Sequence, residues 1–99
     1  MRKIQELVEL IDEELEGAKN YAECYLEKKA AGESRWAGKF QEMAQDELKH
    51  GNYIHDLAMA EITKLKTVYT PPVEMEEKWT TSHKKYVETA AWIKQMLAM

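Results

Sequence analysis

Glu47 and His50 are the residues of this chain whose types and spacing best suit metal chemistry. They interrupt an otherwise apolar helical stripe with steps of three and four residues, whose other members are Trp36, Phe40, Met43, Ile54 and Leu57. Burying an ionised carboxylate is costly unless it is paired or bound to a cation. An acid and a histidine one helical turn apart on such a stripe therefore indicate a metal ion.

Glu14 supplies a third candidate ligand. It is the one charge on an earlier stripe that otherwise contains Leu7, Leu10, Ile11, Ala18, Tyr21 and Tyr25. If the two segments form an antiparallel hairpin that turns near Gly32, a rise of about 1.5 Å per residue places Glu14 level with roughly residues 48–52. The alternative is a buried salt-bridge or hydrogen-bond network, for instance with a lysine of a neighbouring helix.

The elements that position these residues are three predicted helices in one domain spanning residues 1–99. They run over about residues 3–30, 35–66 and 73–97, with Gly32 ending the first and Ser34 capping the second. Pro72 and the acids that follow it suit the start of the third. No segment shows a sustained strand alternation, so the predicted fold class is all-α.

Composition limits the partners and the compartment. The net charge of −4 comes without a concentrated basic stripe, which argues against nucleic acid and membrane surfaces as partners. The lone Cys24 and the absence of a long apolar run lead us to expect a cytoplasmic protein. A chain of 99 residues is short for a self-sufficient enzyme core, so we expect a homodimer or higher homo-oligomer.

Two further histidines are expected to be structural. His83 lies on the apolar stripe of the third segment, but the residue three before it is Thr80, so we interpret it as a packed or hydrogen-bonded core histidine. His55 lies about 140° around the helix from His50, because each residue turns the helix by roughly 100°. We therefore expect His55 at the surface.

A glutamate followed some thirty residues later by Glu-x-x-His resembles the half-site of the ferritin-like di-iron carboxylate proteins. The chain holds one copy of the pattern, which makes it most similar to the short encapsulated ferritins, whose four-helix site is built from two identical subunits. The segment Leu10–Tyr21 also resembles the first-helix motif of those ferritins and of rubrerythrins. The resemblance implies a helical hairpin that is half of a four-helix bundle, plus a third helix, completed by dimerisation.

The same resemblance implies roles for individual residues. Glu14, Glu47 and His50 would bind iron in a di-iron site shared by two chains, and Tyr21 would lie beside the metals. Glu13 and Glu16 correspond to acids on an ion access path, although Asn20 stands where an aromatic residue is expected. Carboxylate and imidazole ligands alone also suit Mn or Zn, so iron is inferred from the family.

Three functions are compatible with these residues. The first is a ferroxidase that oxidises Fe(II) for iron storage or detoxification, with an encapsulating shell protein as container and partner. The second is a rubrerythrin-like peroxidase that takes electrons from another protein. The third is a non-catalytic helical interaction protein in which the metal ion stabilises a dimer.

Overall fold

The computed structural model describes residues 2–68 and 70–99 as three helices, which are α1 (Arg2–Ala30), α2 (Ser34–Lys66) and α3 (Val73–Ala98). No strand occurs in these ranges, so the all-α class is confirmed. Each of the three predicted ranges lies within one of the observed helices. Within the described helices, no segment is long and apolar enough to cross a membrane.

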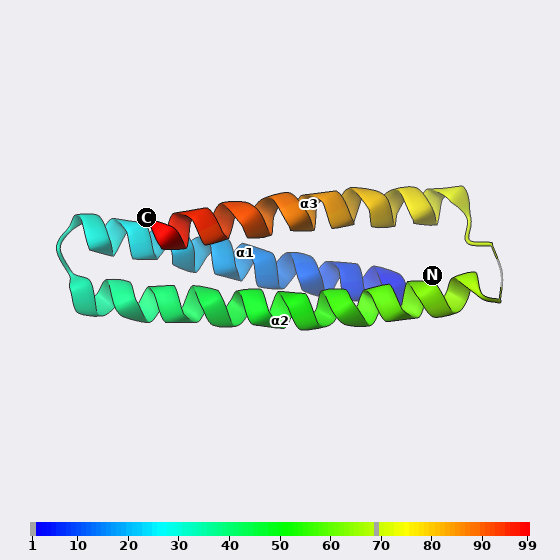
Figure 1. Cartoon of the computed structure of the whole chain (residues 1–99), viewed down its shortest axis with the longest axis horizontal. Helices are drawn as coiled ribbons and strands as arrows, with labels where there is room; N and C mark the ends of the chain where they lie inside the picture. Colours follow the sequence, from blue (N-terminus) through cyan, green and yellow to red (C-terminus); the bar gives the residue numbers. More distant parts are fainter. Residues whose placement is uncertain (1, 69) are drawn as a thin grey trace.

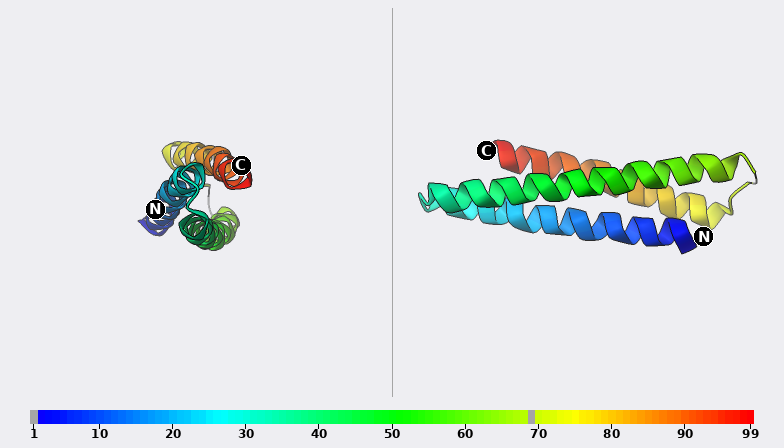
Figure 2. Two further views of the ribbon diagram at one scale, coloured as in Figure 1. Left: turned by 90° about the vertical axis from the view of Figure 1, so that its left-hand side faces the viewer. Right: turned by 90° about the horizontal axis from the view of Figure 1, so that it is seen from below.

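The helices form an elongated bundle of 55 × 18 × 17 Å. Helices α1 and α2 lie side by side in opposite directions, and α3 returns along them in the same direction as α1 (Figure 1). Seen along the long axis, the three helices occupy the corners of a triangle (Figure 2). The α1–α2 pair is therefore covered by α3 on one of its two sides.

The turn between α1 and α2 follows from Gly32, whose φ is +75°. The Gly32 and Glu33 amides donate to the Lys29 and Lys28 carbonyls, which is the Schellman pattern that ends a helix. The predicted cap at Ser34 is wrong, because α2 already begins at Ser34 and Glu33 occupies the N-cap position without a side-chain hydrogen bond. The Glu33 carbonyl accepts from the Ala37 amide, so one residue closes the first helix and opens the second.

Replacing Gly32 by alanine is expected to destabilise the chain by about 1 kcal/mol, because an L side chain disfavours the left-handed conformation. A Cβ at Gly32 would meet no atom within 4 Å, so the cost is conformational alone. The matched control is Gly38→Ala, which is equally uncrowded but helical, and which should stabilise by up to about 1 kcal/mol. Urea denaturation measures the free energy of unfolding of both variants. If both substitutions stabilised the chain, or both destabilised it, the prediction would be contradicted.

The interface between α1 and α2 is lined by small residues. Five of them are fully or nearly fully buried: Ala18, Ala22, Ala37, Ala44 and Ala58. Small side chains let helix axes approach closely. The apolar stripe predicted to be buried on α2 is therefore misplaced, because Trp36, Met43 and Leu57 lie beside this row and are 60%, 40% and 58% exposed.

Helix α3 contacts its two neighbours differently. Its apolar residues Ala90, Ile93, Met96 and Leu97 join the core cluster with α1 residues such as Ile11 and Leu15. Toward α2 it makes side-chain bridges, in which Gln41 donates to the Leu97 carbonyl over 3.0 Å and the Tyr86 hydroxyl donates to Asn52. The α2–α3 contact thus depends on long polar and aromatic side chains.

The two structural histidines meet in this α2–α3 contact. His55 Nε2 lies 2.9 Å from His83 Nδ1, and the His55 ring stacks on Tyr86 with centroids 4.3 Å apart. The interpretation of His83 as a packed, hydrogen-bonded histidine agrees with this arrangement. The surface position expected for His55 is wrong, since its side chain is 14% exposed. His55 lies on a different side of α2 from His50, as expected, but α3 packs against that side and covers His55.

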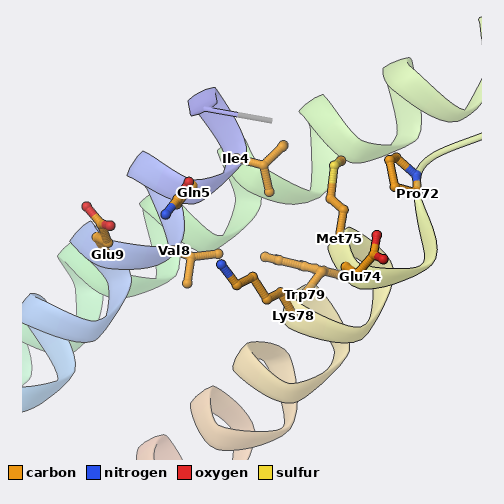
Figure 3. A pocket seen from close by; sticks show the side chains of 9 residues that line it. All are labelled: Ile4, Gln5, Val8, Glu9, Pro72, Glu74, Met75, Lys78 and Trp79. Atoms are coloured by element: carbon orange, nitrogen blue, oxygen red, sulfur yellow. The ribbon is translucent and has the colours of Figure 1, made fainter.

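A separate apolar cavity of about 490 Å³ lies between the amino-terminal parts of α1 and α3. Ile4 and Val8 of α1 face Met75 and Trp79 of α3 across it (Figure 3). None of the predicted site residues lines this cavity.

Candidate metal centre

The candidate ligands converge between α1 and α2. Glu14 lies near the middle of α1, and Glu47 and His50 lie one turn apart in the middle of α2. One ligand atom from each of the three residues lies within 4.8 Å of the others. The antiparallel arrangement of the two helices therefore brings together the acid of one stripe and the Glu-x-x-His of the other.

The spacing of the ligand atoms leaves room for an ion. His50 Nδ1 is 3.6 Å from Glu14 Oε2 and 3.8 Å from Glu47 Oε1, and both distances exceed a hydrogen bond. Oxygen and nitrogen ligands about 2.1 Å from a shared ion lie roughly 3–3.5 Å apart. Small movements of these side chains would therefore suffice to place all three atoms around one cation.

One oxygen of the Glu14 carboxylate lacks a hydrogen-bond partner among the described residues. This atom is Oε2, which is buried and is the one such side-chain atom in the described residues. Across residues 2–68 and 70–99, no lysine pairs with Glu14 or Glu47, and their basic neighbour is His50. A buried carboxylate oxygen is costly when unpaired, so the donor set fits a cation better than it fits a salt bridge with lysine.

The cluster lies at an open edge of the α1–α2 interface. The Glu14 and Glu47 side chains are 26% and 28% exposed, whereas that of His50 is 55% exposed. On α2, the residues that contact α3 include Asn52 and His55. At roughly 100° per residue, Asn52 lies about 140° around the helix from Glu47 and about 160° from His50. His55 lies about 140° from His50 and about 80° from Glu47. Helix α3 therefore covers the side of the α1–α2 pair away from the cluster.

The Glu14 carboxylate influences the protonation of Glu47. The pKa of Glu47 is raised above its ordinary value of 4.5, first because its protonated form hydrogen-bonds to Glu14, and then because of burial and repulsion by the Glu14 charge. His50 acts in the opposite direction and lowers the pKa. Without a bound cation, Glu47 thus keeps its proton to a higher pH than an ordinary carboxyl group, and a metal ion would displace that proton.

We expect the metal-free protein to lose stability as pH rises. A carboxyl group whose pKa is higher in the folded state binds protons more tightly when folded. The contribution of Glu47 to the free energy of unfolding is fully present below the ordinary pKa of 4.5. It is lost as pH rises through the raised pKa of Glu47 in the folded state. Urea denaturation at pH values from about 4 to 8 measures this decline, and Glu47→Gln should remove it.

Glu42→Gln is the matched control for this pH dependence, because Glu42 lies on the same helix with its side chain 67% exposed. The control should retain the decline of the unaltered chain. An equal pH profile for Glu47→Gln and the unaltered chain would show that the carboxylate pair does not carry the effect.

The other residues implied by the resemblance all lie on α1. Tyr21 is half-buried, two helical turns beyond Glu14, and its ring centroid is 6.3 Å from that of Phe40. Glu13 and Glu16 are exposed on α1 and contribute no atom to the ligand group.

Sequence reasoning missed Gly17, which faces the Glu47 carboxylate across the interface. The available signal was a glycine inside a helical pattern. Glycine disfavours helix interiors, so its presence there can indicate a close approach of a neighbouring group. Comparison with known proteins gave no match to any family model, curated protein or solved structure.

Proposed function

We propose that two copies of this chain form a di-iron ferroxidase, with Glu14, Glu47 and His50 of each copy contributing to one shared site. The supporting observation is the pair of close carboxylates with an uncompensated buried oxygen beside a half-exposed histidine. Three protein ligands leave the coordination of two ions incomplete, whereas two copies together supply four carboxylates and two imidazoles. This is the composition of ferritin-like di-iron sites.

The face that carries the cluster suits docking of a second copy. Leu10, Trp36, Met43 and Leu57 are 40% or more exposed there, on the side of the α1–α2 pair that α3 leaves open. An interface between identical surfaces about a two-fold axis would bury these side chains and bring two clusters together. The α1–α2 hairpin would then be half of a four-helix bundle.

Each ligand has a definite role in this proposal. The four carboxylates of the dimer would balance the charge of two Fe(II) ions, which makes a poorly solvated site close to neutral. The bound ions would supply the redox chemistry, in which oxygen or peroxide accepts electrons from Fe(II). Neutral His50 would bind through a ring nitrogen, and Tyr21 would lie within reach as a secondary group. Storage of the ferric product would need a container, such as an encapsulating shell protein.

Anaerobic titration of the metal-free protein with Fe(II), followed by addition of oxygen, tests this function. Native mass and ferric absorbance should be recorded together. We expect saturation near one iron per chain, a dimer in the presence of iron, and rapid oxidation. Failure to bind Fe(II) would remove the proposal.

The exposed apolar face also favours the metal-stabilised interaction protein as a second candidate. In that case Fe(II) or Zn(II) would strengthen the dimer, but oxygen would not oxidise bound iron faster than free iron. A rubrerythrin-like peroxidase would instead oxidise its iron faster with peroxide than with oxygen, and would turn over only when an electron donor is added. The same titration, repeated with peroxide and with an electron donor in addition to oxygen, therefore separates the three functions.

A further inference from the structure

Gly17 of α1 lies against the carboxylate of Glu47 from α2. A Cβ placed on Gly17 would be 2.9 Å from Glu47 Oε2, 3.5 Å from its Cδ and 3.7 Å from its Cγ. Real Cβ atoms essentially never approach a neighbour within 3.0 Å. The observed position of Glu47 therefore requires the absence of a side chain at residue 17.

We infer that Gly17 is a positioning residue of the metal centre, because it leaves the space in which the Glu47 carboxylate lies against α1. This inference rests on the proposed function. Gly17 is three residues from Glu14 and therefore lies on the same face of α1, one turn along. The carboxylate of α2 can consequently come level with the carboxylate of α1 without being pushed away from the helix that bears Glu14.

The required precision explains why one methyl group matters. Metal–ligand distances in protein sites hold to about ±0.2 Å. A Cβ at residue 17 would displace Glu47 Oε2, because the separation of 2.9 Å would have to grow to ordinary van der Waals contact, which begins at 3.4 Å. The conflict is with the mobile end of a side chain rather than with backbone. The displacement is small for the fold but large for coordination. Gly17→Ala should therefore weaken metal binding and leave the metal-free fold intact.

Gly51 offers a matched comparison on the other helix. A Cβ there would lie 3.7 Å from the Glu14 Cβ, which is ordinary van der Waals contact. Both glycines are inside helices, and neither has a positive φ, which among the described glycines belongs to Gly32. Alanine is therefore conformationally acceptable at both positions, and its better helix propensity should raise the melting temperature. The two substitutions are alike in chemistry and differ in their effect on a ligand.

The test measures Fe(II) affinity by anaerobic titration and the melting temperature of the metal-free protein for each variant. Gly51→Ala should raise the melting temperature by up to roughly 4–8 °C and leave Fe(II) affinity unchanged. Gly17→Ala should weaken Fe(II) binding by at least about tenfold, in the range found for residues that orient metal ligands, without lowering the metal-free melting temperature. Equal Fe(II) affinities for the two variants would overturn the inference.

A double-mutant cycle with Glu47→Asp shows whether Gly17 acts through this carboxylate. Aspartate is one methylene shorter, so its carboxylate is withdrawn from residue 17. Glu47→Asp will itself weaken binding, but adding Gly17→Ala to it should cause little further loss, because coupled residues are non-additive. Full additivity of the two losses would overturn the inference.

Two other outcomes separate the possible failures. If the unaltered chain binds no Fe(II), the proposed function and this inference both fall. If it binds Fe(II) but Gly17→Ala lowers the metal-free melting temperature even in a Glu47→Ala background, the conflict lies with the backbone packing. That result would overturn the positioning role alone.

Discussion

Replacing Glu14 by glutamine is expected to reduce Fe(II) binding by at least about 100-fold, the upper end of the losses seen when groups supporting a metal ligand are removed. Glutamine keeps the shape of the side chain but loses the charge of the buried, unpartnered Oε2 atom. In a two-fold dimer the substitution removes one carboxylate from each copy, so the shared site loses two ligands at once. Anaerobic Fe(II) titration measures the loss directly.

The metal-free Glu14→Gln protein should remain folded. Its amide can donate to the Glu47 carboxylate, so repulsion between two acids is replaced by a hydrogen bond. Glu13→Gln is the matched control, because Glu13 is the neighbouring residue in the chain but is exposed and lies outside the ligand group. Undiminished Fe(II) binding by Glu14→Gln, together with normal binding by Glu13→Gln, would show that iron binds elsewhere.

The same variant addresses what the metal does. If the ion serves mainly to hold two chains together, Glu14→Gln should lose the metal-dependent dimer together with metal binding. If the exposed apolar residues of the open face, such as Trp36 and Leu57, are sufficient for association, the dimer should persist without metal. Native mass measurements on this variant therefore show whether association of the two chains depends on the ion.

Much of the fold was predictable from the sequence because the helix signals are local. Gly32 adopts the left-handed conformation that ends α1, and Pro72 precedes the first residue of α3. The interrupted stripes on α1 and α2 could also be aligned, because equal rise along two antiparallel helices fixes which residues are level. Glu14, Glu47 and His50 lie together for this reason.

The buried face of α2 could not be predicted by counting large apolar residues. Two adjacent rows compete on this helix, one of small residues such as Ala44 and one of large residues such as Met43. The small row faces α1, and Met43 is left 40% exposed. Only the tertiary arrangement decides between the two rows. When the small row faces the neighbouring helix, the two helices approach closely, and this can bury more surface in total than burying the largest side chains of one helix. His55 was misjudged for a related reason, since the position of α3 determines its exposure.

Truncating Ile93 to alanine should cause the largest loss of stability among these variants. Ile93 is fully inaccessible to solvent and, with Ile11, is one of the two largest fully buried side chains in the described part of the chain. Removing such a buried side chain typically costs about 2–5 kcal/mol through lost burial and the cavity left behind. Because a small domain is stabilised by only roughly 5–15 kcal/mol in total, a fall in melting temperature of at least about 10 °C is expected.

Val87→Ala is the matched control for Ile93→Ala, because it removes methyl groups from the same helix at a position that is 51% exposed. Its effect should stay within about 0.5 kcal/mol. Below its melting temperature, Ile93→Ala should still bind Fe(II), since the three candidate ligands lie on α1 and α2. Equal melting temperatures for the two variants would mean that α3 does not pack into the core of its own chain. In that case the dimer would have to supply the missing contact, and the melting temperature would depend on protein concentration.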